Sequence, residues 1–188
     1  MGRAQETASF TARRLGLPIR TLDFMHEISW GGPGIPDAGH PWTLSDRMLA
    51  EEDIDLTTAR WREHPYFARN TATACYDRIC DEFDGFLAGL GFERRGFRYL
   101  CSRANGDTIA LFSHGGSGAC AIAYLLNLPF PYVATVMPYD FTSVTVLDIP
   151  GRQGAFVYPR LALFNDIAHT GTELSSPLFQ QFLDDRTI

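Results

Sequence analysis

The chain of 188 residues carries a formal net charge of −6, and 45% of its residues are hydrophobic while 20% are charged. This length is typical of one domain, and the residue types are those of a globular protein. The acidic charge argues against nucleic-acid binding, no apolar run reaches the ~18 residues of a membrane span, and the cysteines form no C-x-x-C pair for zinc. We therefore expect a cytoplasmic protein without nucleic-acid or membrane partners.

The first part of the chain predicts a helix, a short strand and a long loop. Apolar positions on one stripe predict a helix over 3–15, and residues 19–24 suit a short strand. The stretch 29–40 is rich in glycine and proline and contains aromatic residues, which is typical of a loop that covers a site. A second short helix is expected over 45–52.

The middle of the chain holds the strongest helical signal. Apolar residues recur at three- and four-residue steps from 70 to 90, and Gly91 then provides a stop. Two apolar runs, 97–103 and 108–112, flank Asn105-Gly106, a pair that favours a tight reversal. We expect these two runs to form a hairpin.

The last part of the chain predicts one more helix and a second hairpin. A helix is expected over 119–126, after which Pro129 and Pro131 break the chain. Runs of alternating residues predict strands over 141–149 and 155–163. The mixture of helices and strands indicates an α/β domain with a mixed sheet.

The segment 111–118 concentrates the chemistry of the chain. His114 follows the apolar run, and Gly115, Gly116 and Gly118 then open a helix, so an imidazole stands beside exposed amides at a helix N-terminus. On the residues alone, three interpretations of this segment are about equally well supported. They are a dinucleotide site with the pattern G-x-G-x-x-A from Gly116, a serine hydrolase that uses Ser117, and a phosphate site in which His114 acts directly. The hydrolase would complete its triad with Asp148 or Asp166 and then His169.

Ordered motifs elsewhere in the chain distinguish these interpretations. Gly2-Arg3-Ala4-Gln5-Glu6-Thr7-Ala8, then His26-Glu27-Ile28-Ser29-Trp30-Gly31, then Ser113-His114-Gly115-Gly116 occur in sequence, and Asn165-Asp166 precedes His169 near the end. This order resembles the histidine phosphatase superfamily, the phosphoglycerate-mutase-like phosphatases. The resemblance implies a three-layer α/β/α domain with a mixed, mostly parallel sheet. It also implies a pocket at the C-terminal ends of the strands, with the loop 29–40 as its lid.

The resemblance also assigns roles to residues. Arg3 would clamp the phosphoryl group with the help of Gly115 and Gly116, His114 would neutralise its oxygens, and Glu27 would protonate the leaving group. It implies hydrolysis of a phosphomonoester through a phosphohistidine, with phosphoglycerate mutation as the second choice. The ligand would be a small phosphorylated molecule or inorganic phosphate, without metal or organic cofactor, and a homo-oligomer is compatible with the sequence.

One departure from the family pattern is decisive for activity. The Arg-His-Gly segment that supplies the family's phosphoryl acceptor is absent from the sequence. We therefore expect a single domain over 1–188 that lacks the family's first strand and helix and is inactive as it stands. The alternatives are a noncatalytic phosphate-binding or interaction module, and a serine hydrolase that uses Ser117.

Two weaker expectations concern the surroundings of the site. The aromatic residues Trp30, Trp42, Tyr66 and Phe67 suggest an apolar surface near the pocket, which would suit a substrate other than a highly charged sugar bisphosphate. His26, beside Glu27, is expected to be a surface neighbour rather than a catalytic group.

Overall fold

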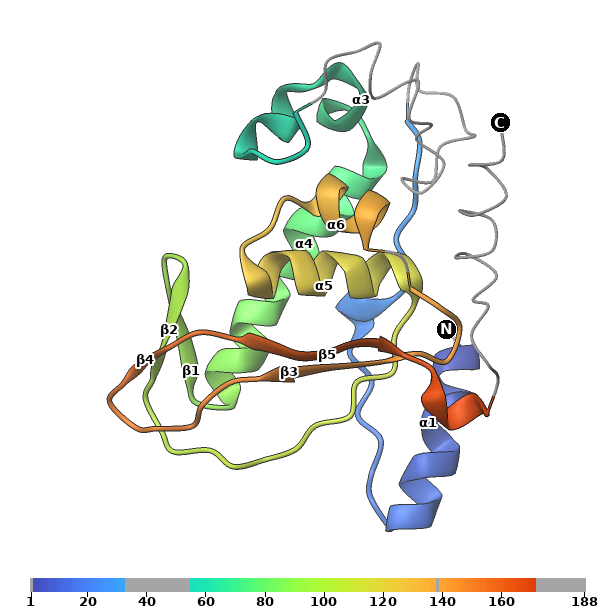
Figure 1. Cartoon of the computed structure of the whole chain (residues 1–188), viewed down its shortest axis with the longest axis vertical. Helices are drawn as coiled ribbons and strands as arrows, with labels where there is room; N and C mark the ends of the chain where they lie inside the picture. Colours follow the sequence, from blue (N-terminus) through green and yellow to red (C-terminus); the bar gives the residue numbers. More distant parts are fainter. Residues whose placement is uncertain (1, 33–54, 138, 172–188) are drawn as a thin grey trace.

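The computed structural model describes residues 2–32, 55–137 and 139–171, which form an assembly of helices and short antiparallel sheets (Figure 1). The expected helix over 45–52 and most of the expected lid lie outside the described residues. The elements are α1 (Gly2–Leu15), η1 (Asp23–Met25), η3 (Ala59–Glu63), α3 (Pro65–Ala68), α4 (Thr71–Gly89), β1 (Phe92–Arg95), β2 (Arg98–Cys101), α5 (Gly115–Leu126), α6 (Phe130–Val136), β3 (Val144–Asp148), β4 (Phe156–Val157), β5 (Arg160–Asp166) and η4 (Ala168–Thr170), where η marks a 3-10 helix.

The long helix α4 begins and ends where the sequence predicts. The side chain of Asn70 accepts a hydrogen bond from the amide of Ala72 at 3.0 Å and so caps the first turn. Gly91, just past the end, has a φ of 95°, and a Cβ there would lie 2.9 Å from the carbonyl oxygen of Arg103. Only glycine therefore fits the turn that joins α4 to β1.

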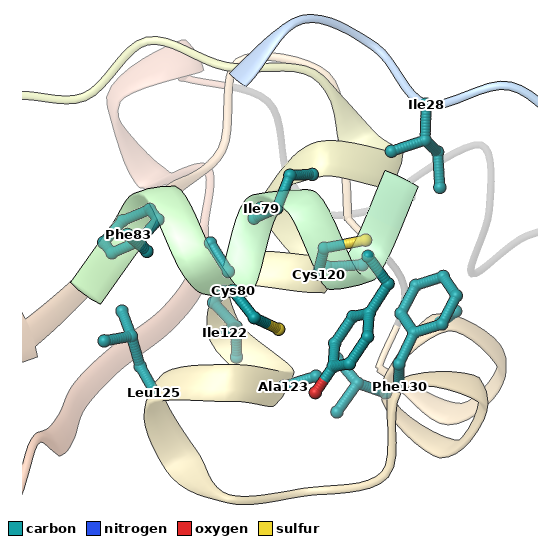
Figure 2. Packing of buried hydrophobic residues seen from close by; sticks show 14 of the residues in the cluster. Ile28, Ile79, Cys80, Phe83, Cys120, Ile122, Ala123, Leu125 and Phe130 are labelled. Atoms are coloured by element: carbon teal, nitrogen blue, oxygen red, sulfur yellow. The ribbon is translucent and has the colours of Figure 1, made fainter. Parts of the chain in front are cut away.

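The core lies where α4 packs against α5, and α6 also packs on α5, with its Phe130 against Tyr76 of α4 (Figure 1). Figure 2 shows Ile79 and Phe83 of α4 meeting Cys120 and Ile122 of α5. Small residues dominate α5, and most of its side chains are buried, so the two helices can approach closely. Burial raises the pKa of Cys80 to about 12 and that of Cys120 well above its ordinary value, so both sulfurs serve as packing groups.

An aromatic cluster closes one end of this core. The ring of Phe130 stacks on Tyr76 at 5.2 Å between centroids and on Trp30 at 5.8 Å, and Trp61 meets it edge-on. Phe67 is fully buried against Trp61. Of the aromatic residues that suggested an apolar pocket, Phe67 is therefore a core residue, Trp30 and Tyr66 are partly buried and pack against the core, and Trp42 lies outside the described residues.

The strands form two separate sheets, one with the order β1-β2-β4 and one that pairs β3 with β5. Every strand pair in the described ranges is antiparallel, so the mixed α and β content is confirmed but the mostly parallel arrangement is not found there. The expected hairpin between 141–149 and 155–163 is present as β3 and β5, although Phe156 and Val157 pair with β2 instead.

The first hairpin is shifted from its expected place. The strand expected within 97–103 is present as β2, but its expected hairpin with 108–112 is wrong, because β2 pairs with β1 around Gly96, whose φ is 66°. Asn105 does not form the reversal, since its side chain donates to the carbonyl of Leu90 at 2.8 Å and accepts from the amide of Asp107 at 2.7 Å. These side-chain bonds hold the Asn-Gly segment against the end of α4.

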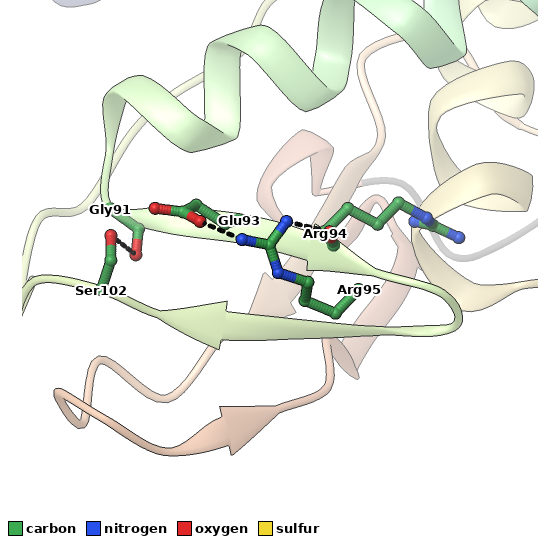
Figure 3. A network of polar contacts seen from close by, with 5 residues as sticks. All are labelled: Gly91, Glu93, Arg94, Arg95 and Ser102. Carbon is green, nitrogen blue, oxygen red and sulfur yellow. Dashed lines mark hydrogen bonds and ion pairs between the residues drawn. The ribbon is translucent and has the colours of Figure 1, made fainter.

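Two neighbouring arginines of β1 differ in what they contact. Arg95 lies on the outer face and pairs with Glu93 at 2.7 Å, while Ser102 closes the base of the hairpin on the carbonyl of Gly91 (Figure 3). Arg94 instead donates to the hydroxyl of Tyr99 and to Asn127, so it ties the hairpin to the end of α5. Arg95 therefore belongs to the exposed face of the hairpin, whereas Arg94 is part of its contact with α5.

Two expected strands are extended segments without regular pairing. Residues 19–24 lead into η1 rather than into a sheet, because 23–25 close a 3-10 turn. Residues 108–112 have no backbone hydrogen bond to any part of the chain that the structure describes. Ile109 and Leu111 in this segment are 49% and 42% exposed. No helix in the described ranges is both long and apolar enough to cross a bilayer.

The aromatic cluster gives a test of the core. Replacement of the fully buried Phe130 by alanine removes three ring contacts and leaves a cavity, so Phe130→Ala should lower the free energy of unfolding by about 3–5 kcal/mol. Phe10 is 63% exposed, and Phe10→Ala should change it by no more than about 0.5 kcal/mol. Urea denaturation followed by circular dichroism measures both, and similar losses in the two variants would contradict this core.

Candidate active site

The site is built on a short strap, residues 25–31, that runs between α4 and α5. On one side, the amide of Thr71 donates to the carbonyl of Gly31 at 2.8 Å, and the amide of Gly31 donates to Asn70. On the other side, the buried hydroxyl of Ser117 donates to the carbonyl of Met25 at 3.1 Å. The strap is thus fixed at both ends to the two helices of the core.

Glu27 projects from this strap onto the start of α5. Its Oε1 accepts hydrogen bonds from the amide of Ser117 at 3.2 Å and from the amide of Ile28 at 3.1 Å. A carboxylate at a helix N-terminus is stabilised by the unpaired amides and by the helix dipole. Oε2 makes no hydrogen bond within the described ranges, so it is the oxygen available to a ligand.

Gly116 allows this close approach. A Cβ at position 116 would lie 2.5 Å from the Cγ1 of Ile28 and 2.7 Å from the Oε1 of Glu27. Any larger residue would push the strap away from the helix. The glycine is itself buried and therefore serves the placement of Glu27.

His114 caps the same end of α5. Its backbone is extended, and its Nδ1 accepts a hydrogen bond from the Nε of Arg3 at 3.2 Å. Because a guanidinium only donates, Nδ1 carries no proton, and the neutral ring holds its proton on Nε2. Burial lowers the pKa of His114 below its ordinary 6.5 and the charge of Arg3 lowers it further, while Glu27 acts in the opposite direction. The ring is therefore neutral at pH 7.

The first amides of α5 complete the site. The amide of Gly118 donates to the carbonyl of His114 at 2.8 Å, and that of Ser117 is taken by Glu27. The amides of Gly115 and Gly116 make no hydrogen bond to the described residues. Two free amides, one guanidinium and an imidazole N–H at a helix N-terminus can together hold a tetrahedral oxyanion.

The structure brings together the residues singled out in the sequence, namely Arg3, Glu27, His114, Gly115 and Gly116. Their location differs from the expectation in one respect. They meet at the N-terminus of α5, which follows an extended segment rather than a paired strand. Among the described residues, no group of three or more histidine, cysteine or acidic side chains is arranged to hold a metal ion.

The environments of the competing motifs favour other roles. Ser117 is fully buried, and its hydroxyl contacts the carbonyl of Met25 and the hydroxyl of Ser113, so it is not presented as a nucleophile. Asp140, the acid that follows the G-x-G-x-x-A pattern and could contact a ribose, accepts from the side-chain amide of Asn165 at 2.8 Å. Both contacts favour structural roles for these residues.

One contact at the site was not predicted. The Nη2 of Arg78 on α4 lies 2.8 Å from the Nδ1 of His26, which directly precedes Glu27. The sequence places Arg78 on the helix 70–90 but gives no signal of which residue it meets, because the strap is distant in the chain. His26 is therefore more than the surface neighbour that the sequence suggested.

The electrostatics of His114 can be measured by NMR titration. The pKa of the ring should lie below 6.5, so the Arg3–His114 hydrogen bond is present at pH 7 and is lost as the pH falls through that lowered pKa. Arg3→Gln should raise the pKa, and Glu27→Gln should lower it further. Shifts of the same sign in the two variants would contradict this arrangement.

The close approach at Gly116 gives a matched pair of glycine variants. Gly116→Ala should lower the free energy of unfolding by about 1–3 kcal/mol, because its Cβ overlaps the strap. Gly118 lies two residues further on with open space around it, so Gly118→Ala should raise stability by about 0.5–1 kcal/mol. Equal effects on the urea midpoint would mean that the strap does not touch α5.

Comparison with known proteins identifies the family. The sequence model of the histidine phosphatase superfamily (branch 1) matches residues 1–161, a range that includes Arg3, Glu27 and His114. No curated protein and no solved structure matches the chain. Because the family model matches most of the chain, the chain belongs to the histidine phosphatase superfamily, branch 1.

Proposed function

We propose that this protein binds the phosphoryl group of a small phosphomonoester at the N-terminus of α5, for hydrolysis through a phosphohistidine. Membership of the superfamily supports phosphatase- or mutase-type chemistry in general. The observation that supports the specific proposal is that Arg3, His114 and Glu27 meet at the N-terminus of α5, where the amides of Gly115 and Gly116 make no hydrogen bond to the described residues.

Arg3 and His114 act as one unit in this proposal. Arg3 uses its Nε to fix the ring of His114 and keeps both terminal nitrogens free for phosphoryl oxygens. The neutral ring then donates its Nε2 proton to another oxygen. Such donors, held in place before the reaction, stabilise the charge on the equatorial oxygens of the transition state without reorganisation.

Glu27 supplies the proton. As a nitrogen of the acceptor histidine bonds to phosphorus and the bond to the ester oxygen breaks, the protonated Oε2 gives its proton to the leaving oxygen. In the second step, the carboxylate accepts a proton from the water that attacks the phosphohistidine and releases phosphate. The bonds from Ser117 and Ile28 to Oε1 keep the other oxygen aimed at the ligand.

The acceptor histidine is the missing part of this arrangement. No Arg-His-Gly occurs in the 188 residues, so the polypeptide alone should bind phosphomonoesters and turn them over poorly. We propose that a strand carrying this histidine, from a longer form of the chain, pairs with residues 108–112. The exposed Ile109 and Leu111 and the unpaired backbone there support this, and such pairing would build the three-layer, mostly parallel sheet.

Phosphate binding and turnover can be separated by experiment. Calorimetric titration with ethyl phosphate at pH 7 should show binding that His114→Ala weakens by at least about tenfold, because each charge-assisted hydrogen bond contributes roughly 1.5–3 kcal/mol. Ser117→Ala serves as a control for the hydrolase alternative, since its hydroxyl is turned into the core. Hydrolysis of p-nitrophenyl phosphate should stay far below ordinary enzyme rates.

Three outcomes would overturn the proposal. Turnover of p-nitrophenyl phosphate at ordinary rates that is lost in His114→Ala would mean that an acceptor is already present in the chain. Labelling of Ser117 by a fluorophosphonate would favour the serine hydrolase, and binding of ethyl phosphate that His114→Ala leaves unchanged would place the anion elsewhere.

A further inference from the structure

The pair Asn105-Gly106, which does not form the expected hairpin turn, has a side chain that is folded back on the backbone. The Oδ1 of Asn105 accepts a hydrogen bond from the amide of Asp107 at 2.7 Å, and this bond brings the side chain across the backbone nitrogen of Gly106. The Nδ2 of Asn105 donates to the carbonyl of Leu90 at 2.8 Å. Both ends of the side-chain amide are therefore fixed, with its carbon facing the backbone of the next residue.

The backbone nitrogen of Gly106 is accessible. Its N–H makes no hydrogen bond to any residue that the structure describes, and Gly106 is exposed. A Cβ at this position would meet no heavy atom within 4 Å, so neither a side chain of its own nor a neighbour shields the nitrogen. Water can also reach the pair, because the residues on both sides of it are exposed.

The other three asparagines of the chain lack this combination. The amides that follow Asn70 and Asn127 each donate to a backbone carbonyl at 2.8 Å. Asn165 lies in β5, where the residue after it is paired with β3. Each of the three is also followed by a residue with a side chain. Within the described ranges, only Asn105 has a folded-back side chain beside an open glycine nitrogen.

We infer that Asn105 is a site of spontaneous covalent modification, at which the backbone nitrogen of Gly106 closes a succinimide ring on the side chain. The nitrogen gives its proton to solvent and bonds to the Cγ of Asn105, while the bond from Cγ to Nδ2 breaks and Nδ2 leaves as ammonia with a proton from solvent. One water molecule then opens the ring at either carbonyl and gives aspartate or isoaspartate. The amide of Asp107 stabilises the charge that develops on Oδ1 during the attack.

The modification changes the contact between Asn105 and α4. The carboxylate of the product has no N–H for the carbonyl of Leu90, and its negative charge lies at the end of α4 where the helix dipole is also negative. Isoaspartate in addition routes the backbone through the side chain and so inserts one carbon just before the segment 108–112. That segment leads to His114, so the modification loosens the connection between α4 and the candidate site.

Peptide mass spectrometry of the full chain during incubation at pH 8 tests this site. We expect conversion at Asn105, detected as the mass gain from NH2 to OH, to be at least about tenfold faster than at Asn70, Asn127 or Asn165. The folded chain should react at a rate within about tenfold of that of the same chain unfolded in urea, because the fold leaves the attacking nitrogen open.

Two matched glycine variants identify the attacking nitrogen. Gly106→Ala should slow conversion at Asn105 at least about tenfold, because the added methyl group shields the nitrogen. The same variant should not lower the thermal midpoint, since open space surrounds the new methyl group. Gly85 of α4 has equally open space, and Gly85→Ala should leave the rate at Asn105 unchanged.

The consequence for the fold is measured on Asn105→Asp, which carries the aspartate product from the start. This variant should lower the thermal midpoint by about 2–4 °C, because the carbonyl of Leu90 loses its donor. An unchanged midpoint would refute the loosening.

Three results would refute the modification site itself. Conversion at Asn127 as fast as at Asn105 would show that the open glycine nitrogen confers nothing. A folded chain that reacts more than about tenfold more slowly than the unfolded chain would mean that the hydrogen bonds of Asn105 protect it. A rate that Gly106→Ala leaves unchanged would exclude attack by this nitrogen.

Discussion

The candidate site depends on one interaction, the hydrogen bond between the carboxylate of Glu27 and the first turn of α5. The carboxylate accepts a hydrogen bond from the amide of Ser117, while the amides of Gly115 and Gly116 make no hydrogen bond to the described residues. The positive end of the helix dipole is therefore only partly neutralised by the described residues. The same contact fixes the strap between the two core helices. The negative charge of Glu27 therefore organises the first turn of α5, where we propose that the phosphoryl group binds.

The position of that carboxylate depends on the core beneath it. Ser117 faces inward from α5 and bonds to the strap, while Asn70 caps α4 and also holds the strap's far end. The close packing of α4 on α5 sets the distance between these anchors, as the buried cysteines and small residues of Figure 2 illustrate. The geometry of the site consequently depends on the packing of α4 against α5. If the two helices moved apart, the charged groups of the site would move as well.

The sequence predicted the elements whose signals are local. The helix 70–90 is confirmed because Asn70 and Gly91 mark its ends, whereas α6 was missed because proline also begins helices, as Pro129 and Pro131 do here. The first hairpin differs from the prediction because the side chain of Asn105 donates to the carbonyl of Leu90 at the end of α4, a residue distant in the chain. The order of motifs was enough to name Arg3, Glu27 and His114, but the Arg78–His26 contact depends on packing that no local pattern encodes.

The segment 108–112, whose backbone makes no hydrogen bond to the described residues, also affects how the chain associates. Its open amides and carbonyls, beside the exposed Ile109 and Leu111, offer a ready template to any extended chain that passes. Self-association therefore competes with correct assembly as the protein concentration rises. Charged or proline residues beside the segment oppose this self-association. A partner strand that paired with these five residues would remove this route to association.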